Sequence, residues 1–147
     1  MPGLKPEDAE FDSSVQARIL IVEDEFLIAM ELEYRLMEAG IEVVGTAITA
    51  EEAIAIAKSE KPDLAIMDIR LAGRRDGVDA AIELYSTLGI RSIFASAHAD
   101  TDTRSRAAPA SPIGWLQKPY QAEELLRLLK TYYQNRDGAG DAQAHSE

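Results

Sequence analysis

The sequence predicts an α/β domain built on a doubly wound parallel sheet, because short apolar segments alternate with longer amphipathic segments. Five short segments are apolar and several are rich in β-branched residues, which is typical of strands buried on both faces. The longer segments have apolar residues at helical spacing, as expected for helices that cover the two faces of a sheet. The length of 147 residues fits one such domain.

The strands are expected at the short apolar runs. The first, Arg18–Val22, reads RILIV. The other four are expected at Ile41–Val44, Leu64–Met67, Ser92–Ala95 and Trp115–Gln117. Parallel strands joined in this way need right-handed crossovers, so their carboxyl ends lie at one edge of the sheet.

Segments with helical character lie between and after these strands. Glu25–Ala39 has apolar residues at helical spacing and is followed by Gly40, a residue that commonly ends helices. Thr49 and Glu52 form the pattern of a capping box, in which the Thr side chain binds a main-chain N–H of the first turn. The later helices are expected at 78–88, 101–108 and 121–133.

The helix expected at 101–108 has the weakest signal. Its sequence, TDTRSRAA, contains no large apolar side chain. Pro109 and Pro112 restrict it to these residues, because proline disfavours helical conformation in the residue before it. We therefore expect this helix to be short or mobile.

The two ends of the chain differ in composition from the region between them. Residues 1–16 are acidic, contain two prolines and lack apolar periodicity, which predicts a flexible extension. Residues 134–147 are polar and rich in Gly and Ala, which predicts a disordered tail. The folded domain is therefore expected at 17–133, and the residues after it are too few for a separate output domain.

The composition argues against several classes of function. The formal net charge is −11 at neutral pH, and a surface this acidic repels nucleic-acid phosphates and anionic lipid headgroups. The chain has no cysteine, so disulfides, cysteine-ligated zinc and a cysteine nucleophile are ruled out. No apolar run approaches the ~18 residues of a membrane span. We expect a cytoplasmic protein that binds neither nucleic acid nor membrane.

Polar residues follow the carboxyl ends of four of the expected strands. Glu23 and Asp24 come after the first strand, Asp68 after the third, Ser96 after the fourth and Lys118 after the fifth. Doubly wound sheets bind ligands at this edge, close to the point where the strand order reverses. We therefore expect three carboxylates, one hydroxyl and one ammonium group to lie together.

This set of groups favours magnesium and phosphoryl chemistry. Two carboxylates ~4 Å apart repel by about 4 kcal/mol at an effective dielectric constant of about 20, so three ionised ones need a counter-charge. A site with oxygen ligands alone suits Mg²⁺, and Lys118 adds a second cation. A carboxylate between these cations can attack a phosphoryl group and form an aspartyl phosphate.

Each element of this pattern has a simpler interpretation when taken alone. Acids after a buried strand are often turn or N-cap residues. A single serine, or a Lys-Pro pair, carries little information. The functional interpretation depends on the occurrence of all these residues at successive strand ends of one chain.

The sequence resembles the response-regulator receiver family of two-component signalling over about residues 17–133. The matching stretches are ILIVEDE (19–25), LAIMDIRLAG (64–73), IFASA (93–97) and WLQKPY (115–120). The set of motifs is specific, although each one alone is weak. The resemblance implies the flavodoxin-like (βα)5 receiver fold, with five parallel strands in the order 2-1-3-4-5.

The resemblance implies a role for each acidic residue at the expected site. Asp68 would be the phosphoacceptor. Asp24 would bind Mg²⁺ directly, and Glu23 would bind it directly or through water. Asp68 and the main-chain carbonyl of Arg70 would supply the remaining protein ligands.

The resemblance also implies which residues form the switch. Ser96 would move its hydroxyl toward the phosphoryl group, and Lys118 would pair with a phosphoryl oxygen. Pro119 would hold the following loop, where a cis bond is one option. Trp115 lies where the family usually has a rotating Tyr or Phe and is bulkier, so a flip and a packing role are both open.

The function implied by the resemblance is that of a stand-alone response regulator. A sensor histidine kinase or a phosphotransfer protein would phosphorylate Asp68. The switched surface would then bind a downstream protein, or the chain would act as a phosphate sink for the kinase. The sequence leaves open the kinase, the signal, and the choice between a monomer and a weak homodimer.

Two other functions fit part of this pattern. A Mg²⁺-dependent phosphatase would use Asp68 as its nucleophile, but such enzymes commonly carry a second acid two residues later, where this chain has Arg70. A pseudo-receiver would bind partners without phosphorylation, but the acids, the serine and the lysine are all present. We therefore expect a signalling phosphoacceptor that assists only its own phosphorylation and dephosphorylation, and not an enzyme with a separate substrate.

Overall fold

Five parallel strands form one sheet in the computed structural model, which describes the backbone of residues 17–146 and the side chains of residues 17–136. The strand order is β2-β1-β3-β4-β5, as predicted. The order reverses at β1, because β2 lies on one side of β1 and the later strands lie on the other. The strands are β1 Arg18–Val22, β2 Glu42–Ala47, β3 Leu64–Asp68, β4 Arg91–Ser96 and β5 Gly114–Gln117.

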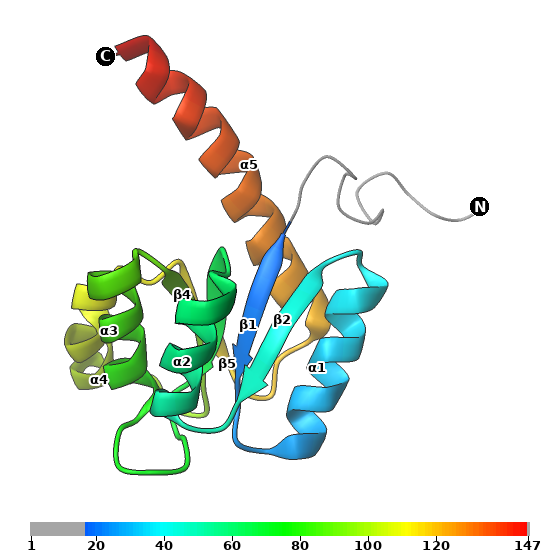
Figure 1. Cartoon of the computed structure of the whole chain (residues 1–147), viewed down its shortest axis with the longest axis vertical. Coiled ribbons are helices and arrows are strands. Elements are labelled where there is room, and N and C mark those ends of the chain that lie inside the picture. Colours follow the sequence, from blue (N-terminus) through cyan, green and yellow to red (C-terminus); the bar gives the residue numbers. More distant parts are fainter. Residues whose placement is uncertain (1–16, 147) are drawn as a thin grey trace.

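Helices cover both faces of this sheet, as a doubly wound fold requires. Figure 1 shows α1 and α5 on one side of the sheet, and α2, α3 and α4 on the other. The helices are α1 Phe26–Glu38, α2 Ala50–Glu60, α3 Gly77–Leu88, α4 Thr101–Ala107 and α5 Ala122–Ser146, with a short 3-10 turn, η2, at Ala108–Ala110.

The two faces of the sheet bury separate apolar cores. Alternate residues of β1 point to opposite faces, so Leu20 packs with α2 and α3 whereas Ile21 packs with α1 and α5. All five residues of β3 are buried, and its last residue is Asp68. Burial of a strand on both faces explains why its sequence is continuously apolar up to that acid.

The turn into α2 has the predicted cap with one difference. The Oγ1 atom of Thr49 accepts a hydrogen bond from the main-chain N–H of Glu52 at 3.0 Å. The carboxylate of Glu52 accepts from the N–H of Ile48 at 2.8 Å, whereas in a capping box it accepts from the N–H of the N-cap residue, here Thr49. Thr49 also forms a parallel bridge to Ala72, which joins this turn to the loop after β3.

Strand β2 is longer than the predicted run Ile41–Val44. It extends to Ala47, which pairs with Val22 of β1. The N–H of Glu23 donates to the carbonyl of Ala47 at 2.9 Å, so this pairing continues into the residues after β1. The apolar pattern ends early because β2 lies at the edge of the sheet, where most of its residues are only partly buried.

Two predictions about the chain ends have different outcomes. The predicted acidic extension, residues 1–16, lies outside the described residues. At the other end, α5 continues to Ser146 instead of ending at Tyr133, where we predicted the start of a disordered tail. The guanidinium of Arg136 lies 4.7 Å from the ring centre of Tyr133 and 3.8 Å from Asp63, so contacts to the domain extend past the predicted end. The last turns of α5 project from the domain (Figure 1).

Among the described residues, every helix is either too short or too polar to cross a membrane.

Candidate functional site

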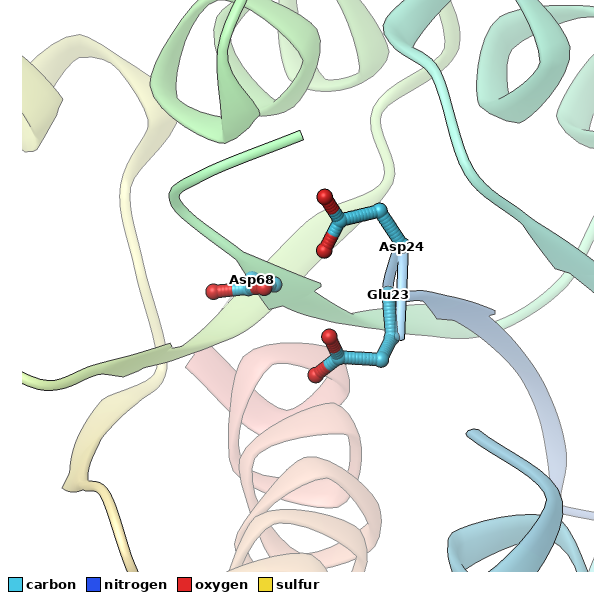
Figure 2. A group of neighbouring side chains, drawn as sticks. All are labelled: Glu23, Asp24 and Asp68. Carbon is cyan, nitrogen blue, oxygen red and sulfur yellow. The ribbon is translucent and has the colours of Figure 1, made fainter. Parts of the chain in front are cut away.

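Three carboxylates meet at the carboxyl end of the sheet, where β1 and β3 lie side by side. Glu23 and Asp24 directly follow β1, and Asp68 is the last residue of β3. One oxygen from each carboxylate lies within 4.8 Å of the others. Figure 2 shows the side chains of Glu23 and Asp24 extending from the end of β1 toward the end of β3, where Asp68 lies. The fold therefore brings together the three acids that the sequence placed at one edge.

The three acids differ in their exposure to solvent. Glu23 and Asp68 are buried, whereas Asp24 is exposed at the mouth of the site. Burial, and after it the negative charge of Glu23, raises the pKa of Asp68 to about 6 despite the opposing effect of Lys118. Before any metal ion binds, the surroundings of Asp68 therefore disfavour its ionised form.

Lys118 supplies the positive charge nearest to the carboxylates among the described residues. Its Nζ lies 2.9 Å from Oε1 of Glu23 and 3.2 Å from Oδ2 of Asp68. Burial alone would lower the pKa of Lys118, but hydrogen bonds and charge from Glu23 and Asp68 outweigh this effect and raise it. The bond from Lys118 to Pro119 is cis, and the N–H of Lys118 donates to the carbonyl of Ser96 at 2.9 Å. Lys118 is therefore held from both its main chain and its side chain.

The cluster is compatible with a small, hard cation. Mg²⁺ binds oxygen ligands at about 2.1 Å in an octahedron, so opposite ligands are about 4.2 Å apart. The carboxylate oxygens lie within 4.8 Å of one another, so only a small adjustment of the side chains would bring them to the spacing that Mg²⁺ needs. The donors are all oxygens, which favours Mg²⁺ over the softer metals that prefer His or Cys.

Ser96 lies at the same edge of the sheet, one strand further along. It is the buried last residue of β4, next to Ala95, which pairs with Asp68. Its Oγ accepts a hydrogen bond from the N–H of His98 at 3.1 Å. The hydroxyl therefore already orients the loop that leads into α4.

Trp115 and Arg70 do not contact the carboxylates through any described interaction. Trp115 lies on β5 opposite Phe94, and their rings stack with centres 4.7 Å apart. The other neighbour of its ring is the guanidinium of Arg104, 4.7 Å from the ring centre. Arg70 is exposed in the loop after β3, and the role of its carbonyl as a ligand stays a prediction.

Two residues at the start of α3 were not predicted from the sequence. A Cβ at Gly77 would lie 1.9 Å from the main-chain oxygen of Asp68, so only glycine fits there without a shift. The preceding residue, Asp76, caps α3 in a complete capping box with Asp79. The signal for this cap is a capping residue followed three positions later by an acid, the spacing that predicts the cap at Thr49 and Glu52.

Comparisons with known proteins agree with this geometry. The family model described as the response regulator receiver domain matches residues 19–130. The transcriptional regulatory protein PdtaR of Mycobacterium tuberculosis is 41% identical over 119 residues, which cover 81% of this chain and 58% of the relative. The phyllosphere-induced regulator PhyR of Methylorubrum extorquens is 34% identical over 139 residues, which cover 93% of this chain and 51% of the relative. The chain thus spans little more than half the length of these curated relatives.

Solved structures give the same result. The receiver domain of a modulated diguanylate cyclase from Desulfovibrio desulfuricans has a TM-score of 0.74 at 36% identity, over 80% of this chain and 93% of that one. The response regulator PhyR from Brucella abortus has a TM-score of 0.75 at 30% identity, over 90% of this chain and 54% of that one. Because the family model matches most of the chain and the fold is the same, this chain belongs to the response regulator receiver domain family.

Proposed function

We propose that this receiver domain accepts a phosphoryl group on Asp68 from a sensor histidine kinase or a phosphotransfer protein. One observation carries the proposal: the Asp68 carboxylate lies 3.2 Å from the Lys118 amine and shares a cluster with two further carboxylates. This arrangement offers a nucleophile, a counter-charge and a place for a divalent cation at one point. Glu23, Asp24, Asp68 and the carbonyl of Arg70 would hold Mg²⁺.

The chemistry follows from the positions of these groups. An oxygen of Asp68 attacks phosphorus, the acyl phosphate forms, and the bond from phosphorus to the donor nitrogen breaks with the electron pair remaining on the donor. Bound Mg²⁺ would neutralise negative charge on the phosphoryl oxygens. Lys118 then exchanges its contact with Asp68 for one with a phosphoryl oxygen. These residues assist phosphorylation of their own chain, and the proposal involves no separate substrate that is turned over.

The switch residues belong to the same proposal. The Ser96 hydroxyl would leave the N–H of His98 and donate to a phosphoryl oxygen. This change would pull on the loop before α4, while Pro119 fixes the loop after β5. Trp115 would follow the movement of α4 through Arg104 instead of flipping alone.

A partner could dock beside this site on α1. Six large apolar side chains on this helix are exposed, and the first of them, Phe26, comes two residues after Asp24. The six are Phe26, Leu27, Ile28, Met30, Tyr34 and Met37. A helix of the phosphoryl donor that packs on this face would bring its phosphorylated histidine close to Asp68, which supports α1 as a docking face.

The output is also part of the proposal. Phosphorylation would change the surface around α4 for a downstream protein, or the domain would draw phosphoryl groups away from a shared kinase. We propose a stand-alone protein that acts in the cytoplasm, where kinases draw on ATP, as a monomer or weak homodimer. If the protein is stand-alone, its mass when isolated from cells should equal the 16.1 kDa of this chain.

Phosphotransfer profiling tests the whole proposal. The protein is incubated with Mg²⁺ and purified histidine kinases, and in parallel with a small phosphodonor. We expect one hydroxylamine-sensitive phosphoryl group on Asp68, and none in Asp68→Asn or Asp68→Ala. Labelling that persists in both variants, or that never occurs with any donor, would contradict the proposal.

A further inference from the structure

Helix α4 is attached to the domain mainly by polar contacts. It has seven residues, and only Ala107 among them is buried. Two arginines on α4 reach the neighbouring elements: Arg104 to the Trp115 ring and Arg106 to the start of α3. The position of α4 therefore depends on these two side chains more than on apolar packing.

Arg106 binds both acids of the α3 capping box. Its Nη2 pairs closely with Oδ2 of Asp76, and its Nη1 lies 3.4 Å from Oδ1 of the same carboxylate. Nη1 also lies 3.5 Å from Oδ1 of Asp79. This fork-to-carboxylate geometry is stronger and more directional than an ordinary surface ion pair.

The α3 end of this ion pair is fixed to the phosphoacceptor strand. Asp76 caps α3 with its side chain, and the next residue, Gly77, donates its N–H to the carbonyl of Ile69 at 2.7 Å. The backbone of Gly77 also lies directly against the main-chain oxygen of Asp68. The start of α3 therefore cannot follow a movement of α4 without disturbing the end of β3.

The α4 end of the pair is attached to a different part of the site. The β4–α4 loop begins at Ser96, and Asp100 caps α4 by accepting from the N–H of Thr103 at 2.8 Å. The N–H of His98 donates to the Ser96 hydroxyl at one end of this loop, and Arg104 of α4 donates to the carbonyl of Ala99 at 3.3 Å further along it. A shift of Ser96 would thus move α4 relative to the fixed Asp76.

We propose that the ion pair between Arg106 and Asp76 is a latch that holds α4 in its resting position and opposes the rearrangement caused by phosphorylation. The inference rests on the proposed function of Asp68, since the latch regulates that site. Breaking the pair removes an interaction of the resting state, so the phosphorylated conformation becomes more populated. The latch acts at a distance from the phosphoryl group and forms no contact with it.

The chain contains its own reporter for this movement. Trp115 is the single tryptophan in the sequence, and its ring lies between Phe94 and the guanidinium of Arg104. Displacement of α4 removes the cation from one face of the indole. Tryptophan fluorescence during titration with beryllofluoride and Mg²⁺, a mimic of the phosphoryl group, therefore follows α4 directly.

The test compares Arg106→Gln and Asp76→Asn with the unmodified chain. Asn preserves the N-cap, so Asp76→Asn removes the ion pair without removing the helix start. We expect each variant to bind beryllofluoride about threefold to fivefold more tightly, the range for one partly exposed pair. The double variant should gain no more than Arg106→Gln alone, because Arg106→Gln already removes the contacts with both Asp76 and Asp79. Amide exchange at 99–110 should be faster in the free variants.

Arg75→Gln is the matched control. Arg75 pairs with Glu83 of α3 at 2.7 Å and with Glu51 of α2, so its loss removes the same charge without touching α4. Loss of a cation by itself weakens binding of an anion, which is opposite to the tighter binding expected when the latch is broken. Arg106→Gln that binds no more tightly than the unmodified chain would overturn the latch alone. An unmodified chain that neither binds beryllofluoride nor accepts phosphate would overturn the proposed function itself.

Discussion

The first residue of α3, Gly77, is packed directly on Asp68: a Cβ on Gly77 would lie 1.9 Å from the main-chain oxygen of Asp68. Gly77→Ala should therefore force α3 away from β3. We expect a loss of about 2–3 kcal/mol in the free energy of unfolding, as for other overpacked sites. Urea denaturation measures the loss, and labelling by a small phosphodonor should fall with it.

Gly40→Ala is the control for this change. Gly40 has a φ of +85° and no atom near the position of an added Cβ, so alanine there adds only backbone strain. We expect a cost of about 1 kcal/mol and unchanged labelling. Equal effects of the two substitutions on labelling would show that the contact with Asp68 is unimportant.

Lys118 is the counter-charge for two buried acids, so Lys118→Gln should lower the free energy of unfolding of the metal-free protein. Loss of one partner leaves Glu23 and Asp68 uncompensated, and we expect about 1–3 kcal/mol lower stability together with at least tenfold slower phosphorylation. Lys58→Gln, at an exposed position of α2, should change neither quantity. Normal phosphorylation of Lys118→Gln would remove lysine from the proposed chemistry.

Mg²⁺ should stabilise the fold through the carboxylate cluster. At a concentration 100 times the dissociation constant, a ligand of the native state adds about 2.7 kcal/mol. Differential scanning fluorimetry should show a rise in Tm that Asp24→Asn and Asp68→Asn reduce and that Glu31→Gln on α1 does not. A rise that persists in the first two variants would place the cation elsewhere.

The ion pair at Asp76 predicts a dependence of stability on pH. Burial tends to raise the pKa of this carboxyl, but the Arg106 guanidinium and the N–H groups of α3 outweigh it and lower the pKa below the usual 3.8. The stabilisation is then fully present above pH 3.8 and is lost as the pH falls through the lower folded-state pKa. The difference in unfolding free energy between the unmodified chain and Asp76→Asn should shrink over that acidic range. A difference that grows on acidification would contradict the assignment.

The exposed apolar face of α1 predicts a separation of two activities. Met30→Glu should reduce phosphotransfer from a protein donor at least tenfold, because it places a charge in the docking face. Labelling by a small phosphodonor should remain, since Met30 does not contribute to the carboxylate cluster. Tyr85→Glu on α3 is the matched control, as Tyr85 is also exposed but belongs to another helix. Loss of both activities in Met30→Glu would indicate misfolding instead.

The predictable features of this fold were those encoded in local patterns. The apolar runs of β1 and β3, the cap at Thr49 and the early end of α4 before Pro109 each depend on neighbouring residues, and the structure has them where expected. The clustering of Glu23, Asp24 and Asp68 could also be predicted, because the carboxyl ends of parallel strands lie at one edge of the sheet. Local sequence patterns were sufficient to place a strand, a cap or a helix end wherever its position depends on neighbouring residues alone.

The features that were not predicted depend on contacts between distant segments. Gly77 needs the backbone of Asp68 to explain it, and the two arginines of α4 are uninformative until α3 and β5 lie beside them. The contact between Arg136 and Asp63, which joins α5 to the domain beyond Tyr133, exists only in the folded chain. A local sequence pattern does not show which distant residues will meet, so these contacts can be recognised only in the folded structure.

Glu23 and Lys118 form their 2.9 Å contact across 95 positions of the chain. During synthesis the acids of the first strand leave the ribosome long before their amine does. The nascent chain thus carries Asp68 without the lysine that pairs with it, and the charge cluster is complete only when the last strand has joined the sheet. If Asp68 accepts the phosphoryl group as we propose, chains that end before Lys118 should not be labelled.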